Sequence, residues 1–351
     1  MLGISSYFKD LSFEYLSQAR IRGAEYVFTS LHIPEEDQGL VRLHIQPFLY
    51  HVQAIGLLPV FDISMKTFEL LGLEENDFDG LLEKGITCIR LDYGFDQPEL
   101  VKQLMVSFNV FLNASTLDER LLKQCQEIGI DMGELTVMHN FYPKRDTGLG
   151  WDVFCQKNHL FKAFGLRVMA FVAGDSLKRF PLYEGLVTVE KHRQIHPLVA
   201  AMELLEKGEV DDVVVGDSEA KLSTLSALSE FINNRTVVLP VWSESGCPLD
   251  FSTTYMIRRD DSERLIRLNV RRSEDIGPRH NNIRCKGAIT QDNRLAGRYC
   301  GEIQIQRVSL ENSPSSNVIA FIRQDMVDAV DFISSSMLLR FASMNETRSD
   351  D

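Results

Sequence analysis

The chain has 351 residues, of which 25% are charged and 44% hydrophobic, and its formal net charge is −13. This composition excludes a fibrous or disordered protein, and the length favours two domains. No apolar run reaches the ~20 residues that span a bilayer. We therefore expect no membrane span. Because no basic stripe occurs in the first 234 residues, we expect no nucleic-acid partner either.

The cysteines and the N-terminus bear on the compartment. The six cysteines form no CxxC motif and no metal-finger spacing, and Cys88 and Cys155 lie within apolar runs. Buried free thiols are typical of a reducing compartment. The N-terminal MLGISSYFKD lacks a basic region followed by a long apolar stretch, so it does not resemble a signal peptide. We therefore expect a cytoplasmic protein.

Eight short apolar or β-branched runs alternate with stretches of helical period along the first 234 residues. Strands separated by helices pair in parallel, and eight is the number at which such a sheet closes. The pattern therefore predicts an α/β protein whose first domain, residues 1–234, is a (β/α)8 TIM barrel; a doubly wound open sheet is the alternative. The predicted strands are LGISSYF (2–8), YVFTSLHI (26–33), LLPVFDIS (57–64), TCIRLDYG (87–94), VFLNAS (110–115), LTVMHNFY (135–142), RVMAFVAG (167–174) and DVVVGDS (212–218).

Glycines and short polar residues indicate where several of the helices begin and end. Glycine tolerates the left-handed conformation that closes a helix, which we expect at Gly129, Gly165 and Gly208. Short side chains with an oxygen acceptor begin helices, and Asp118 and Asp217 are candidates for that position.

The pattern changes after Asn234. Alternating runs with few helical stretches predict a small, mostly antiparallel β domain over residues 235–351. The segment DMVDAVDFISS is its main helix candidate. This domain is also rich in arginine, and a planar guanidinium suits phosphate; Arg271 and Arg279 are the candidates for a phosphate contact.

Polar residues at the C-terminal ends of barrel strands face the pocket, and carboxylates are frequent there. Glycosidic chemistry needs two carboxyl groups, one to donate a proton and one to act as nucleophile or base. Asp62 and Asp92 come from neighbouring strands and form the first candidate pair, with Glu35 and Asp217 in reserve. Crowding of the first pair would raise the pKa of one member.

Each carboxylate also has a purely structural interpretation. Asp217 could simply cap the following helix, Asp92 could be held by Arg90, and Glu35 could complement a helix dipole.

A metal site is a further alternative at these strand ends. The side chains of His32, Asp62 and His139 have the ligand types for a divalent metal. The HxH and HExxH spacings are absent, and we expect no metal and no cofactor.

Two long segments follow strands and could bind substrate. HNFYPKRDTGLG (139–150) mixes aromatic and amide groups that suit a sugar ring, and GDSLKRFPLYEGLVTVEKHR (174–193) follows the seventh strand, where barrels frequently hold phosphate. The basic candidates in the second segment are Lys178, Arg179, His192 and Arg193. The residues expected to orient a sugar are His32, Asn113, His139, Asn140 and Tyr142.

Several of these segments, in this order, resemble a known family. They are GISSYF, FTSLHIPEED, DIS, LRLDYGF, LNAST, HNFYPKRDTGLG, FVAGD with PLYEGLVTVEKHR, VDDVVVGDSEA and, in the second domain, IGPRHNNIRCKGAITQDNRLAGRYCGEIQI. Together they resemble the MupG-type 6-phospho-N-acetylmuramidase family over nearly the whole chain. Phe180 and Val187 depart from the glycine and proline usual at these places in relatives.

The resemblance implies a TIM barrel followed by a cyclophilin-like domain. It also implies hydrolysis of the disaccharide of 6-phospho-N-acetylmuramic acid and N-acetylglucosamine in cytoplasmic cell-wall recycling. The partner would then be this small phosphorylated amino-sugar disaccharide. A non-catalytic phosphosugar-binding module and a metal-dependent phosphosugar aldolase or isomerase are the alternatives. The substrate's own N-acetyl group could also serve as nucleophile.

Overall fold

The computed structural model describes residues 1–31, 33, 35–92, 94–95, 97–273 and 275–345. They divide into two compact units, Met1–Ser229 and Glu230–Asp351, which are described separately. Among the described helices, none combines the length and the apolar composition needed to cross a bilayer.

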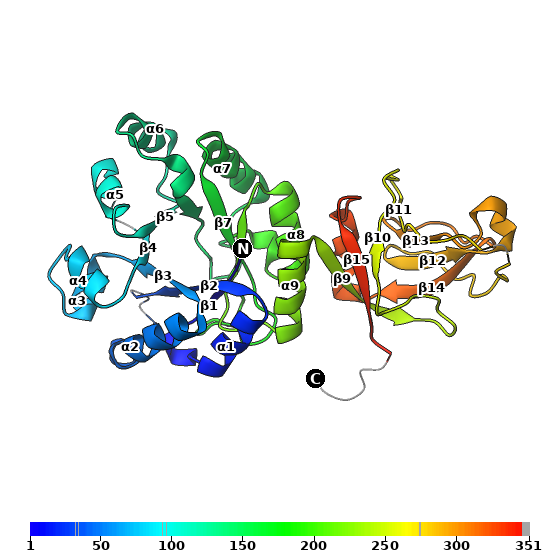
Figure 1. Cartoon of the computed structure of the whole chain (residues 1–351), viewed down its shortest axis with the longest axis horizontal. Coiled ribbons are helices and arrows are strands. Elements are labelled where there is room, and N and C mark those ends of the chain that lie inside the picture. Colours follow the sequence, from blue (N-terminus) through cyan, green and yellow to red (C-terminus); the bar gives the residue numbers. More distant parts are fainter. Residues whose placement is uncertain (32, 34, 93, 96, 274, 346–351) are drawn as a thin grey trace. The chain divides into compact units, whose positions relative to one another are not determined.

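The first unit is a closed barrel of parallel strands in the order β1 to β8, surrounded by helices (Figure 1). The predicted TIM barrel is therefore confirmed. Each strand pairs with the next along the chain, and β8 pairs with β1. The strands are β1 (Leu2–Ser5), β2 (Ala24–Ser30), β3 (Leu58–Ile63), β4 (Cys88–Leu91), β5 (Asn109–Asn113), β6 (Thr136–Met138), β7 (Arg167–Val172) and β8 (Asp212–Val215).

The helices cover the outside of these strands. They are α1 (Phe13–Ile21), α2 (Gln38–Ile55), α3 (Met65–Leu71), α4 (Phe78–Glu83), α5 (Pro98–Leu104), α6 (Glu119–Glu127), α7 (Trp151–Ala163), α8 (Pro197–Lys207) and α9 (Leu222–Asn234). Short 3₁₀ helices occur at η1 (Phe8–Asp10), η2 (Met132–Glu134) and η3 (Glu190–His192).

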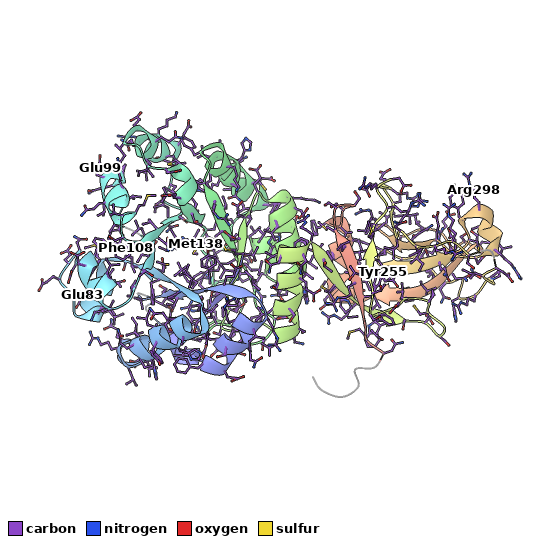
Figure 2. The ribbon with its side chains drawn as sticks, in the orientation of Figure 1. Glu83, Glu99, Phe108, Met138, Tyr255 and Arg298 are labelled. Carbon is purple, nitrogen blue, oxygen red and sulfur yellow. The ribbon has the colours of Figure 1, made fainter. Side chains whose placement is uncertain are left out.

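The barrel interior is filled by alternate residues of its strands. Met138, labelled in Figure 2, belongs to a fully buried cluster inside the barrel. Because successive strand residues point to opposite faces, this cluster fixes which later residues point into the barrel mouth. Its buried members are Phe28, Val60, Cys88, Phe111, Met138, Met169, Phe171 and Val214.

The helix ends follow the predictions in part. Asp118 begins α6, and its side chain accepts a hydrogen bond from the Leu121 N–H at 2.8 Å. Gly129 and Gly165 are left-handed, with φ of 77° and 81°. The prediction for Gly208 was wrong, because its φ is −94°. Glycine is needed there for space instead, since a Cβ would lie 2.7 Å from the Leu204 carbonyl oxygen.

The second unit is built on a seven-stranded sheet in the order β10-β15-β9-β14-β12-β13-β11. Its pairings are antiparallel except for β15 with β9, so a mostly antiparallel sheet was predicted correctly. The strands are β9 (Thr236–Ser243), β10 (Thr254–Met256), β11 (Leu265–Arg267), β12 (Ala288–Asp292), β13 (Ile303–Gln306), β14 (Ser316–Ile322) and β15 (Leu338–Ser343).

Two 3₁₀ helices, η4 (Arg294–Tyr299) and η5 (Gln324–Asp331), complete the second unit. The predicted helix DMVDAVDFISS corresponds to η5, which winds as a 3₁₀ helix rather than an α-helix. Buried Met326, Ala329 and Val330 hold it against the unit.

Candidate active site at the barrel mouth

The polar residues at the ends of β3 to β6 that share a face with the interior cluster lie together at the mouth. Asp62 is two residues beyond Val60 of the cluster, and Arg90 is two residues beyond Cys88. Asp62 pairs with Arg90 in the register of β3 and β4. Asp92 comes directly after β4 and lies beside Asn113 of β5, which donates a hydrogen bond to it. The fold therefore brings Asp62, Arg90, Asp92 and Asn113 to one edge of the barrel.

A buried ion pair begins the polar network of this mouth. The Arg90 Nη1 donates to Asp62 Oδ1 at 2.6 Å, and both side chains are buried. The Nη2 group of Arg90 donates to the Met138 carbonyl oxygen at 3.4 Å and also to Asn140 Oδ1. A buried guanidinium is costly unless it is paired and hydrogen-bonded, so these contacts fix the positions of Asp62 and Asn140.

The network continues from Asn140 to Asp92. Asn140 Nδ2 donates to the Ser115 hydroxyl at 2.9 Å, and the Ser115 N–H donates to Asn113 Oδ1 at 2.9 Å. Asn113 Nδ2 then donates to Asp92 Oδ1 at 2.7 Å. One series of hydrogen bonds thus connects the two candidate carboxylates through β3, β4, β5 and the end of β6. Side chains positioned in this way need little reorganisation to bind a substrate.

Tyr142 lies beside the same network. Burial raises the pKa of its phenol, and interaction with Ser115 offsets part of that rise. Its backbone N–H donates to the Val187 carbonyl oxygen at 2.9 Å, which joins the segment after β6 to the one after β7. The Tyr142 hydroxyl is therefore a neutral group near the mouth, suited to hydrogen bonding rather than to proton abstraction.

His139 lies on the opposite face of β6 from Met138, and it packs against α7 instead of the mouth. Its Nε2 lies 2.6 Å from Asn158 Oδ1, and its ring centroid lies 4.7 Å from that of Phe154. Since Asn158 Nδ2 donates to the Gly208 carbonyl at 2.6 Å, the His139 Nε2–H must donate to the amide oxygen. Burial lowers the pKa of His139 to about 4. The structure therefore does not bring His139 together with Asp62.

Asp217 also points away from the barrel interior, and only 1% of its surface is exposed. Its carboxylate accepts from the backbone N–H groups of Gly174 at 2.8 Å, Arg179 at 2.9 Å and Leu186 at 3.2 Å. These three residues lie at different places along the segment 174–193 after β7. In the structure Asp217 thus organises that segment, whereas its catalytic role stays a prediction.

The basic residues of the segment 174–193 have different environments. Arg193 donates to Glu190 and to the carbonyl oxygens of Tyr142, Lys144 and Gly185. His192 contacts Glu203 at 2.8 Å. Lys178 donates to the Gly174 carbonyl and lies 3.5 Å from Asp217. These three hold the segment together, whereas among the described residues the guanidinium of Arg179 has no acceptor for its Nε and Nη2 groups.

Glu36, beside the candidate Glu35, is the buried carboxyl of the IPEED segment. Burial raises its pKa to about 7. The backbone N–H groups of Lys9 and Phe8 offset part of this rise in pKa, but neither carboxyl oxygen has a hydrogen bond of ordinary geometry among the described residues. Glu36 lines a pocket of about 110 Å³ with Ser30 and Lys66. Glu35, the preceding residue, is exposed. The sequence alone gives no sign of which of these two adjacent glutamates is buried.

The metal interpretation loses support from the geometry of its proposed ligands. His32 lies outside the described residues, and His139 is engaged with Asn158. Within the described ranges, no group of three or more histidine, cysteine, aspartate or glutamate side chains is arranged to hold a metal ion.

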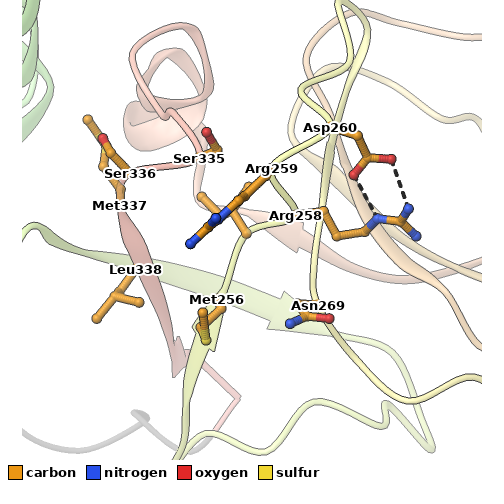
Figure 3. Close-up of a pocket in the computed structure, with 10 residues that line it drawn as sticks. Met256, Arg258, Arg259, Asp260, Asn269, Ser335, Ser336, Met337 and Leu338 are labelled. Atoms are coloured by element: carbon orange, nitrogen blue, oxygen red, sulfur yellow. Dashed lines mark hydrogen bonds and ion pairs between the residues drawn. The ribbon is translucent and has the colours of Figure 1, made fainter.

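The arginines of the second unit are described within that unit alone. Arg271 is exposed, and Arg279 donates to the Gly246 carbonyl at 2.6 Å. Their contact with a phosphate stays a prediction. A pocket of about 520 Å³ lies elsewhere in this unit, and neither arginine lines it (Figure 3). Its lining residues are Met256, Ile257, Arg258, Arg259, Asp260, Asn269, Ser335, Ser336, Met337 and Leu338.

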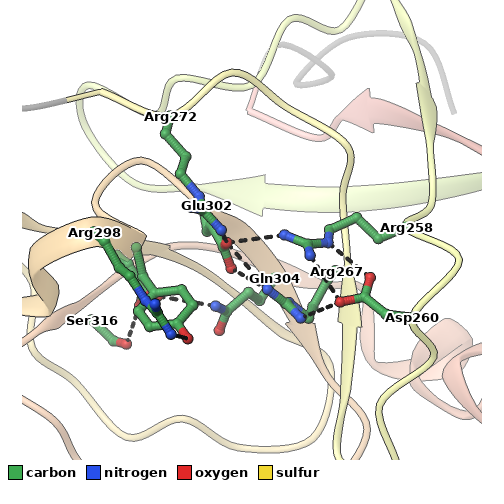
Figure 4. A network of polar contacts seen from close by, with 10 residues as sticks. Arg258, Asp260, Arg267, Arg272, Arg298, Glu302, Gln304 and Ser316 are labelled. Atoms are coloured by element: carbon green, nitrogen blue, oxygen red, sulfur yellow. Dashed lines mark hydrogen bonds and ion pairs between the residues drawn. The ribbon is translucent and has the colours of Figure 1, made fainter.

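Three further arginines surround Glu302, a buried carboxylate directly before β13 (Figure 4). Arg267 Nη2 donates to it at 2.9 Å, Arg258 Nη1 at 3.1 Å and Arg272 Nε at 3.0 Å. Asp260 neutralises the same group by pairing with Arg258 and Arg267. These arginines are therefore bound to carboxylates of their own domain.

A closed parallel barrel with a buried carboxylate, arginine and amide network at the C-terminal ends of its strands is the arrangement of a barrel enzyme. The N-terminal family of 6-phospho-N-acetylmuramidases matches residues 2–230, and the corresponding C-terminal family matches residues 243–342. The chain belongs to the 6-phospho-N-acetylmuramidase family, and it is a glycosidase. The resemblance noted in the sequence is confirmed.

Two solved structures share the architecture of the whole chain. A conserved Enterococcus faecalis protein of unknown function is 29% identical, covers 98% of this chain with 97% of its own, and has a TM-score of 0.84. An uncharacterized Bacillus cereus protein is 23% identical, covers 97% of this chain with 99% of its own, and has a TM-score of 0.77. The second likeness concerns the fold alone. No curated protein matches the chain.

Proposed function

We propose that this glycosidase hydrolyses the bond between 6-phospho-N-acetylmuramic acid and N-acetylglucosamine during cytoplasmic recycling of the cell wall. The family supports a phosphorylated muramic sugar as substrate. The observation that carries the proposal is the hydrogen-bond network from Asp62 to Asp92, because it holds two carboxylates in place, through the Arg90 guanidinium and neutral amide and hydroxyl groups, at one edge of the barrel.

Asp62 and Asp92 have different partners, and this difference suggests a division of roles. Asp62 is paired with Arg90, which suits a carboxylate that acts on the anomeric carbon or on a water molecule. Asp92 accepts from the Asn113 amide, which aims its carboxyl group at the mouth, and we assign it the protonation of the leaving oxygen. If the substrate's N-acetyl group is the nucleophile, Asp62 would orient that group instead.

Amide and phenol groups around the two carboxylates would position the sugar. Asn113 and Asn140 are held by Asp92, Arg90 and Ser115, and the Tyr142 hydroxyl lies next to Ser115. Because these groups are held in place before substrate binds, the ring can be oriented at little entropic cost.

The test is turnover of the phosphorylated disaccharide by Asp62→Asn and Asp92→Asn variants. Each substitution replaces the carboxylate by an amide of similar size, which cannot act as acid, base or nucleophile. We therefore expect kcat to fall by at least about 100-fold. Asp131→Asn is the matched control, because Asp131 is exposed and caps η2 at the other end of β6, where asparagine caps equally well. Near-normal kcat in both mouth variants would show that the pair is wrongly assigned.

A further inference from the structure

Arg179, in the segment after β7, is a buried cation with unused hydrogen-bonding capacity. Only 4% of its surface is exposed. Its guanidinium carbon lies 4.8 Å from the centroid of the Tyr7 ring and 5.3 Å from that of Phe180. Contacts of a guanidinium with aromatic rings are favourable but leave its N–H groups free to donate.

Two of those N–H groups are not satisfied by the residues that the structure describes. The Nε and Nη2 atoms of Arg179 are buried and have no hydrogen-bond acceptor among the described residues. The facing carboxylate is that of Glu35, whose Oε2 lies 3.6 Å from Nη2, beyond hydrogen-bond length, on a side chain that is 43% exposed. Buried donors without acceptors are costly, and a native structure keeps few of them without a reason.

The position of Arg179 is nevertheless firmly fixed. Its backbone N–H donates to Asp217 Oδ1 at 2.9 Å. The Tyr7 hydroxyl beneath it donates to the Gly216 carbonyl at 2.7 Å. A second cation, the Lys9 ammonium, lies 4.3 Å from the centroid of the Phe180 ring. A rigidly held guanidinium with two free donors and a nearby ammonium is suited to bind an oxyanion in a bidentate manner.

We propose that Arg179 anchors an oxyanion of the phosphosugar substrate, its phosphate or its lactyl carboxylate, and that this group takes the place of Glu35 at the guanidinium. The proposal rests on the proposed function for the identity of the ligand. Glu35 then acts as a counterion that leaves when substrate binds, which its exposure permits.

Binding of inorganic phosphate tests the site without requiring turnover. We expect phosphate to raise the Tm of the full-length wild-type protein, and Arg179→Lys to weaken this effect because lysine cannot donate in a bidentate manner. Glu35→Gln should strengthen the effect, since it removes the competing carboxylate. Arg120→Gln, which changes an exposed arginine on α6, is the matched control.

Steady-state kinetics with four disaccharides then distinguish the two anions. The substrates carry both anionic groups, the phosphate alone, the lactyl carboxylate alone, or neither. We expect Arg179→Lys to raise KM roughly 10- to 100-fold for substrates that carry the recognised anion, with kcat changed little. A penalty confined to phosphorylated substrates identifies the phosphate, and one confined to lactyl substrates identifies the carboxylate.

Two results would overturn the proposal. One is an equal penalty on all four disaccharides, which would indicate a structural arginine. The other is phosphate stabilisation that is the same in wild type, Arg179→Lys and Glu35→Gln. Absence of any hydrolysis by the wild type would instead refute the proposed function, while the phosphate measurement would still decide the role of Arg179.

Discussion

Glu36 gives a quantitative prediction about the pH dependence of stability. Burial raises its pKa from 4.5 to about 7, so the folded protein binds this proton more tightly than the unfolded chain does. The cost of the buried charge is absent below pH 4.5, grows as pH rises through 7, and is then constant. At 1.36 kcal/mol per pH unit, a difference of about 2.5 units corresponds to about 3 kcal/mol.

The perturbation is Glu36→Gln, which keeps the size of the side chain and removes its ionisation. We expect the free energy of unfolding of the variant, relative to wild type, to increase by about 3 kcal/mol between pH 4.5 and pH 8. For a domain of this size, that corresponds to a relative rise in Tm of roughly 6–12 °C.

The assay is urea unfolding followed by circular dichroism at 222 nm, because the α-helices belong largely to the barrel. Using the difference between variant and wild type cancels the titration of all other groups. Glu75→Gln removes the same charge from an exposed side chain of the barrel and serves as the control. Parallel stability profiles for wild type and Glu36→Gln from pH 4.5 to 8 would refute the reasoning.

Three further predictions concern other buried charges and ionisable groups. Because burial lowers the pKa of His139 to about 4, this residue alone should subtract about 3 kcal/mol from the stability of wild type as pH falls from 6.5 to 4; in urea unfolding the stability of His139→Gln relative to wild type should rise by that amount over this range, and a constant difference would contradict it. Asp217→Asn should destabilise the barrel by about 3 kcal/mol and expose the bond after Lys178 to trypsin, whereas unchanged cleavage would argue against its organising role. Glu302→Gln removes the buried carboxylate that three arginines share, and Asp260 remains to pair with two of them, so calorimetry should show a second unit less stable by about 1–3 kcal/mol, beyond any effect of changing the exposed Asp275.

The barrel could be predicted from sequence because its information is local. Each strand is an apolar run followed by a helical stretch, and the closed order β1 to β8 follows from that alternation. The parallel pairing of β15 with β9 could not be predicted, because it joins residues about a hundred positions apart. For η5, the apolar spacing of DMVDAVDFISS indicated a helix but could not distinguish a 3₁₀ from an α-helix.

The candidate site was predictable only where strand phase alone decides. Asp62, Asp92, Asn113 and Asn140 share a face with the interior residues of their strands, and the structure places them together. His139 is one residue after the interior Met138, and Asp217 is three residues after the interior Val214 of β8. Because both separations are odd, these two side chains point away from the barrel interior. Counting this alternation in the sequence could have shown that these two residues do not face the mouth. The unused donors of Arg179, in contrast, depend on packing that no local pattern reveals.

The alternation along β6 also bears on how this enzyme could acquire new specificity. Asn140 points into the mouth, whereas His139 before it is bonded to Asn158 of α7. In a mutational library over consecutive residues, about half of the substitutions would therefore fall on side chains that pack the strands against the helices. A library restricted to every second position would sample new substrate preferences while sparing the scaffold, and most of its members should still fold.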